Sequence, residues 1–248
     1  MQPEEILLEE PAAPPAREPF WDYVDLALVL GLLFASIAAV VLVCGVLAFA
    51  VPALKDDPTP LLLPMQLVLY LFVYICFFVV FKFRHDKPVF ASLGWRGITV
   101  NPIVLVVSGA ALAIGISVLA KIIHTPQVKS PIDEITKTPL SLAVFSVMAV
   151  TIAPLFEELF FRGFIQPLLS RTFGVAAGVV STAVLFGALH APEYSWAWQY
   201  ALAVSIAGAV FGWVRARTQS IIPGTIMHGS YNLVFIVGLL LMKYGPHK

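Results

Sequence analysis

The sequence predicts an all-α protein that crosses a membrane about seven times. Hydrophobic residues make up 59% of the 248 residues and charged residues only 12%, whereas soluble domains carry about 25% charged residues. The mean hydropathy is +0.90. This composition excludes a disordered chain, a basic nucleic-acid-binding domain and a disulfide-rich secreted scaffold. We therefore expect membrane lipid as a partner and no nucleic acid.

Long apolar runs place the membrane helices. A helix needs about 20 apolar residues to cross a hydrocarbon core, and lipid offers its backbone no partners outside the helix. The runs 26–51, 61–83, 102–123 and 140–161 meet this length. The run 175–189 is short, 196–214 contains glycines, and 221–242 contains a histidine and an asparagine. Together they predict seven helices, with the last four forming one bundle.

Composition divides the chain into four parts. Residues 1–25 are rich in proline and carry five glutamates, so we expect a disordered acidic tail and not a signal peptide. We expect membrane helices with interfacial loops in residues 26–139, a helical core in residues 140–242 and a short tail in residues 243–248. Lys and Arg are more numerous on the side of the N-terminus, nine against six. This bias predicts a multi-pass protein of the plasma membrane with a cytoplasmic N-terminus.

Three charged residues lie in the fourth apolar run: Glu157, Glu158 and Arg162. A charge at the bilayer centre costs about 2.5 to 3.5 kcal/mol on insertion scales, so each marks a candidate site. Glu158 and Arg162 are four residues apart, which places them on one helix face as a pair. Glu157 projects about 100° away and has Phe161, not a base, one turn on. An unpaired carboxylate in apolar surroundings suits a general base.

One alternative and one geometric difficulty bear on this charged group. Arg162 could mark the end of the helix and reach the membrane surface, with both glutamates forming an interfacial charge cluster. If the polar residues instead form one site, straight helices that start from the side where the fourth helix ends would place His190 and His228 at different depths from Glu157. They can meet only if helices tilt, if the fourth helix extends towards Leu169, or if the fifth helix starts at a displaced position.

The later runs contribute further polar side chains. His190 ends the fifth run, and His228 and Asn232 are four residues apart in the seventh. With Glu157, these residues provide a base, an acid and hydrogen-bond donors for an oxyanion, the groups that amide hydrolysis by activated water requires. In one mechanism Glu157 and His190 activate the water while His228 and Asn232 stabilise the oxyanion. In the other, Glu157, His190 and His228 bind zinc; we favour the first, without a cofactor.

The motifs resemble a known family. Glu157-Glu158-x-x-x-Arg162, Phe186-x-x-x-His190 and His228-x-x-x-Asn232 follow one another on successive membrane helices. In this order they are similar to the three motifs of the CPBP group, which comprises type II CAAX prenyl proteases and their bacterial relatives. The resemblance covers about residues 140–242.

The resemblance implies an intramembrane endopeptidase that cleaves a membrane-associated peptide or protein. It implies that Glu157 is the base, that His190 assists it, that His228 and Asn232 bind the oxyanion, and that Glu158 and Arg162 shape the site. It does not decide between the metal-free and zinc mechanisms. A membrane scaffold or transporter remains the alternative function, although the two halves show no internal repeat of the transporter kind.

Overall fold

The computed structural model describes residues 19–56 and 59–245. Within these ranges the chain consists of helices and loops, which confirms the predicted all-α membrane fold. The predicted disordered tail covers residues 1–25, of which residues 1–18 fall outside the described residues, as do the last three residues of the C-terminal tail. For residues 19–25 the prediction is wrong, because helix α1 already begins at Tyr23.

Seven long helical segments follow one another in the part of the chain that the structure describes. The fourth is built from five consecutive pieces, of which η2 and η3 are π-helical, and is called here the fourth span (Pro139–Phe173). The long helices are α1 (Tyr23–Ala50), α3 (Leu62–His85), α5 (Pro102–Ile122), the fourth span with α7 (Pro139–Val147), η2 (Met148–Ile152), α8 (Ala153–Glu157), η3 (Glu158–Ile165) and α9 (Gln166–Phe173), α10 (Val175–His190), α11 (Trp198–Thr218) and α12 (Ile222–Tyr244). The short ones are α2 (Pro52–Asp56), η1 (Thr59–Leu61), α4 (Val89–Ser92), α6 (Pro131–Ile135) and η4 (Ala191–Tyr194).

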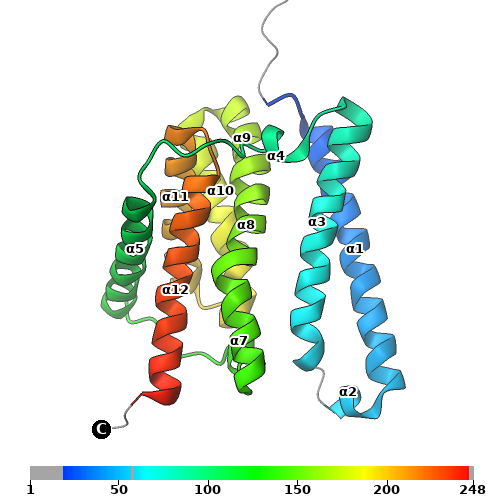
Figure 1. Ribbon diagram of the computed structural model, residues 1–248, viewed down its shortest axis with the longest axis vertical. Coiled ribbons are helices and arrows are strands. Elements are labelled where there is room, and N and C mark those ends of the chain that lie inside the picture. Colours follow the sequence, from blue (N-terminus) through cyan, green and yellow to red (C-terminus); the bar gives the residue numbers. More distant parts are fainter. Residues whose placement is uncertain (1–18, 57–58, 246–248) are drawn as a thin grey trace, which may run out of the picture.

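Six of these segments are long and apolar enough to cross a membrane. The exception is α11, which spans 21 residues but carries Gln199, Arg215 and Arg217 among small residues. The predicted number of seven crossings is therefore not confirmed by length and composition. In Figure 1, α1 begins at one end of the molecule and α12 finishes at the other.

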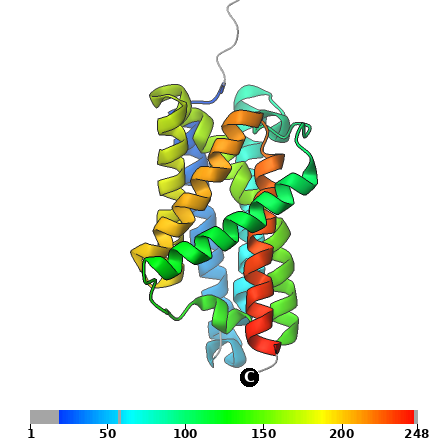
Figure 2. The ribbon, with the colours of Figure 1, turned by 90° about the vertical axis from the view of Figure 1, so that its left-hand side faces the viewer.

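The helices form a bundle with a hairpin beside it. The hairpin consists of α1 and α3, and the bundle contains the fourth span, α10, α11 and α12 (Figure 1). Helix α5 crosses obliquely over α12 and α11, as Figure 2 shows. Glycines allow the close packing: a Cβ on Gly109 of α5 would lie 2.2 Å from the carbonyl oxygen of Met227 in α12, and one on Gly187 of α10 would lie 2.3 Å from that of Ala201 in α11.

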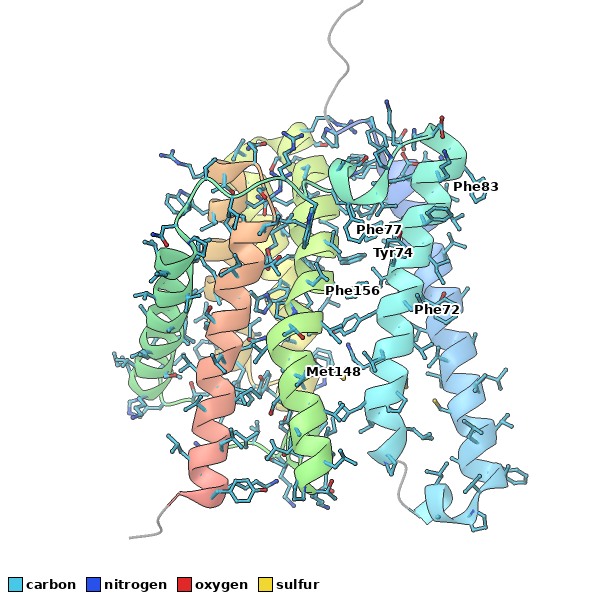
Figure 3. All side chains as sticks on the ribbon, viewed as in Figure 1. Phe72, Tyr74, Phe77, Phe83, Met148 and Phe156 are labelled. Carbon is cyan, nitrogen blue, oxygen red and sulfur yellow. The ribbon has the colours of Figure 1, made fainter. Side chains whose placement is uncertain are left out.

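An aromatic cluster joins the hairpin to the bundle. Phe77 and Phe81 of α3 pack against Phe164 of the fourth span, with ring centroids 5.0 and 6.0 Å apart. Trp21 stacks on Phe164 and donates an indole hydrogen bond to its carbonyl oxygen at 3.1 Å. Figure 3 shows Phe77 and Phe156 in the region between the hairpin and the fourth span. These contacts fix the hairpin near the start of α1.

The residues just before α1 are ordered by their own polar contacts. Asp22 accepts from the backbone N–H groups of Val24 and Asp25, and the Asp25 carboxylate accepts from the N–H of Asp22, which is a capping box. The buried Asp25 side chain also binds Arg84 and His85 at the end of α3. Helix α1 therefore begins at Tyr23, three residues before the apolar run that predicted it.

Candidate active site

The fourth span continues well past the predicted boundary at residue 161. It ends at Phe173, although it contains Gly163 and Pro167, residue types that disfavour a helix interior. Each π-helical segment ends two residues before a proline, Pro154 or Pro167. A proline within a helix lacks an N–H and clashes with a carbonyl of the preceding turn, and a wider π turn can accommodate that carbonyl. The helix thus passes both prolines and places Glu157 near its middle.

This extension brings the predicted site residues to similar depths. At 1.5 Å per residue, Glu157 lies about 24 Å before the end of the fourth span at Phe173, and His190 lies about 22 Å beyond the start of α10 at Val175. Helix α12 starts deeper in the molecule than the end of α11 (Figure 1). Its start is covered by a loop, because the N–H of Ile221 donates to the carbonyl oxygen of Gly94. Of the three expected ways for the residues to meet, the longer fourth helix is present, whereas the fifth helix, α10, starts at Val175 as its apolar run does.

Glu158 and Arg162 form the ion pair that their spacing predicted. The distance from Arg162 Nη1 to Glu158 Oε1 is 3.0 Å, and both side chains are fully buried. The alternative in which Arg162 ends the helix and reaches the membrane surface is therefore wrong. The continuous helix keeps Arg162 among protein groups and prevents it from reaching water.

Arg162 makes further contacts with the bundle that support its burial. Its Nη2 donates to the carbonyl oxygen of Gly208 at 2.9 Å, and its guanidinium lies 4.4 Å from the ring centroid of Phe186. One turn later, Gln166 donates to the carbonyl oxygen of Gly212 at 2.8 Å. A Cβ on Gly208 would lie 3.1 Å from Arg162 Nη2, and one on Gly212 would lie 2.8 Å from Gln166 Oε1. The two glycines therefore let α11 receive both side chains.

His228 lies between the two glutamates. Its Nδ1 is 3.2 Å from Glu158 Oε1, and its Nε2 is 3.7 Å from Glu157 Oε2. The imidazole is buried and stacks on Phe211 with ring centroids 4.8 Å apart. Gly224, one turn earlier on α12, leaves room for Glu158, because a Cβ there would lie 2.9 Å from Glu158 Oε2.

Glu157 is more accessible than its neighbour. Its side chain is 21% exposed, whereas that of Glu158 is fully buried. The prediction that Glu157 has no basic partner on its own helix agrees with the structure, since the nitrogen facing it comes from His228 on α12. Of the two carboxylates, Glu157 is the one that water or a substrate can reach.

His190 and His228 both contact the ring of Phe186. The Phe186 ring is 4.5 Å from the His190 ring and 5.9 Å from the His228 ring, centroid to centroid. His190 Nδ1 lies 2.7 Å from the carbonyl oxygen of Phe186. Because a carbonyl can only accept, Nδ1 carries the hydrogen, and Nε2 of the neutral ring is left as an acceptor.

Asn232 binds the first π-helical segment. Its Nδ2 donates to the carbonyl oxygen of Ala149 at 2.7 Å, and an amide nitrogen has a second hydrogen to give. A Cβ on Gly229 would lie 2.6 Å from the carbonyl oxygen of Val150, so α12 approaches this segment closely. The predicted site residues thus fall into a contact group of Glu157, Glu158, Arg162 and His228, with His190 and Asn232 on its flanks.

Glu193 is a polar neighbour that the motifs do not identify. It follows His190 in η4 and interacts electrostatically with both His190 and Glu157. The only sequence signal for it is an acidic residue three positions after a motif histidine, in a turn that contains Pro192.

Zinc would need its three ligands in one place. Among residues 19–56 and 59–245, no three His, Cys, Asp or Glu side chains gather as a metal ion requires. Glu157 and His228 approach each other at 3.7 Å, and both histidine rings contact Phe186. The side-chain arrangement does not fit a three-ligand zinc site built from these residues.

Comparison with known proteins supports the relationship that the motifs suggested. Residues 139–234 match the family model for type II CAAX prenyl endopeptidase Rce1-like proteins. No curated protein and no solved structure shows significant similarity to the chain. The matched segment contains the fourth span, α10, α11 and most of α12, with all three motifs. Over this segment the chain is similar to the type II CAAX prenyl endopeptidases.

Proposed function

We propose that the protein hydrolyses a peptide bond of a membrane-associated peptide or protein, with Glu157 as the base on water. The carrying observation is the contact group in the middle of the fourth span, in which Glu157 is the accessible carboxylate. The match of residues 139–234 to an endopeptidase family model supports hydrolysis of a peptide bond as the reaction. A base held next to hydrogen-bond donors away from bulk water suits amide hydrolysis.

The charges of the contact group favour a protonated His228. Two glutamates and one arginine leave one negative charge, which an imidazolium between the carboxylates would cancel. A neutral group is less costly to keep within a membrane than a charged one. In this form His228 Nδ1–H donates to Glu158. The 3.7 Å between His228 Nε2 and Glu157 is too long for a direct hydrogen bond, so Nε2–H remains free for a substrate oxygen.

The proposed reaction conserves protons at each step. Glu157 takes a proton from water as the water oxygen bonds to the scissile carbonyl carbon. The oxyanion then accepts hydrogen bonds from His228 Nε2 and from the second amide hydrogen of Asn232. As the C–N bond breaks, Glu157 returns the proton to the leaving nitrogen. His190 assists by accepting a hydrogen bond from the water at Nε2, which positions the water and takes no proton from it.

Replacing the base tests the proposal. Glu157→Gln keeps the size of the side chain but cannot accept the proton, so cleavage should fall by about 10²- to 10⁴-fold. The measurement is hydrolysis of a fluorogenic CAAX peptide by the full-length protein in vesicles, with and without a prenyl group on the peptide. Glu134→Gln makes the same change in an exposed side chain and should leave the rate unchanged.

Three outcomes separate the alternatives. Full activity in the folded Glu157→Gln variant would refute the assignment of the base. Loss of wild-type activity with a chelator, restored by zinc, would favour the metal-dependent mechanism. Absence of hydrolysis with every peptide, prenylated or not, would favour a scaffold that retains the family's motifs without turnover.

A further inference from the structure

A cleft of about 560 Å³ opens at the end of the molecule where α1 begins. It lies between the residues that precede α1, the segment around α4, and the ends of α9 and α11. This cleft, called here the basic cleft, is separate from the contact group of Glu157. Among the described residues that line it none is acidic, and four are cationic: Lys87, Arg96, Arg171 and Arg215.

Several contacts hold this basic wall in place. Arg171 Nη1 donates to the carbonyl oxygen of Pro19 at 2.6 Å. The guanidinium of Arg215 lies against Gly94, which has a φ of +85°, and a Cβ there would lie 2.8 Å from Nη2. The backbone at Arg96 is fixed by a hydrogen bond from Ser220 Oγ to its carbonyl oxygen at 2.9 Å. The fold thus brings several cationic side chains to one cleft, an arrangement that attracts an anion.

The position of the basic cleft points to the membrane surface. Arg171 and Arg215 lie in the last turns of α9 and α11, and Lys87 follows the end of α3 by two residues. These helix ends are where the apolar spans give way to polar surroundings. Phosphate groups of lipids occupy this level of a bilayer, and basic pockets between membrane helices suit such headgroups.

An apolar groove adjoins the basic cleft. It has a volume of about 740 Å³ and shares Lys87, Pro88 and Ala91 with the basic cleft. Its other lining residues include Phe90 and Trp95, whose side chains are 41% and 42% exposed. A basic cleft with an apolar groove on its rim complements an amphiphile, with a phosphate in one and acyl chains along the other. A free phosphate ion would use only the first.

We propose that the basic cleft binds the phosphate headgroup of an anionic phospholipid, through Lys87, Arg96, Arg171 and Arg215. This site lies outside the family's motifs and does not depend on the proposed peptidase reaction. Its ligand is a lipid that stays bound at the rim of the bundle.

The test is binding of fluorescent phosphatidylglycerol to the full-length protein in a neutral detergent. Removing two cations with Lys87→Gln/Arg171→Gln should weaken binding about 30-fold, since each cation near an anionic headgroup contributes about fivefold. Lys121→Gln/Lys129→Gln removes two cations outside the cleft and should bind as the wild type does. Fluorescent phosphatidylcholine with the same acyl chains should bind weakly to all three proteins.

Further arms keep the proposal open to refutation. Arg171→Lys preserves the charge and should keep most of the affinity. If the double variant is misfolded, Lys87→Gln alone, at an exposed position, should weaken binding about fivefold. Equal affinity in cleft and control variants would overturn the proposal. Displacement of the lipid by an equal concentration of inorganic phosphate would overturn the lipid assignment in favour of a soluble anion.

Discussion

Arg162 shows how a charge is tolerated inside an apolar bundle. The carboxylate of Glu158, the carbonyl of Gly208 and the face of Phe186 surround its guanidinium. Each contact uses a different property: charge, hydrogen bonding and ring polarisability. A lysine could not match all three, because its ammonium is compact and lacks the planar fork. We therefore regard Arg162 as the residue on which the local fold depends most.

Removing Arg162 should destabilise the protein strongly. Arg162→Met leaves Glu158 buried without its partner, which typically costs about 3 to 5 kcal/mol. The measurement is the unfolding midpoint in detergent. The double variant Glu158→Gln/Arg162→Met removes both charges and should regain part of the loss, whereas simple additivity of the two single variants would contradict the coupling.

The packing of helix α12 against the fourth span depends on glycines. Gly224 and Gly229 admit Glu158 and the carbonyl of Val150, so one face of the helix lies directly against the fourth span. At Gly238, further along the same helix, a Cβ would meet no other atom within 4 Å. Helix α12 therefore contains two glycines at close contacts, Gly224 and Gly229, and a third, Gly238, at which an added methyl group has open space.

The glycines of α12 provide a matched pair of substitutions. Gly229→Ala forces a methyl group against backbone, which cannot move as a side chain does, and should destabilise by about 1 to 3 kcal/mol and reduce cleavage. Gly238→Ala should be neutral or slightly stabilising, because alanine favours the helix. Unfolding midpoints and rates of both variants check this, and equal effects would refute the contact role of Gly229.

The sequence predicted side-chain contacts within one helix better than contacts between helices. The pair of Glu158 and Arg162 follows from a spacing of four residues and is confirmed. The position of His228 between two carboxylates depends on how α12 is rotated against the fourth span, which no local pattern specifies. The end of that span was placed too early because the apolar run stops at Arg162. The polar side chains of Arg162 and Gln166 suit a buried helix only because the carbonyls of Gly208 and Gly212 on α11 accept from them.

At the scale of the whole molecule, the hairpin and the bundle have separate roles. The contact group of Glu157 is built from the fourth span and α12, with α10 and α11 around it. Helix α1 contributes none of these residues, and most of its side chains face outward. Its attachment depends on the aromatic cluster and on the polar contacts around Asp22 and Asp25.

The start of α1 should loosen in acid. A hydrogen bond from the backbone N–H of Asp25, with a second from Val24, lowers the pKa of Asp22. Its stabilisation is therefore complete above the ordinary aspartate pKa of about 3.9 and is lost as the pH falls through the lowered value. Asp22→Ala should cost about 1 kcal/mol above that range. Hydrogen exchange at residues 24–26 measures both effects.

A matched variant isolates this carboxylate. Asp22→Asn keeps an accepting oxygen without a titrating proton, so its exchange should vary less with pH than that of the wild type. Identical pH profiles in the two proteins would show that another group controls the start of α1.

Because the fourth span contains π-helical turns, the direction of its side chains depends on the number of residues in each turn. A π turn holds one residue more than an α turn, and each residue turns a helix by about 100°. Because the π turn already accommodates the extra residue, deleting one residue between Gly163 and Ile165 should restore a regular α-helix and leave Gln166 facing Gly212. Deleting one residue from the α-helical stretch Pro139–Val147 has no such compensation and should rotate the residues before it by about 100° relative to the site. The consequence of a change in residue count within the fourth span therefore depends on whether it falls in a π-helical or an α-helical turn.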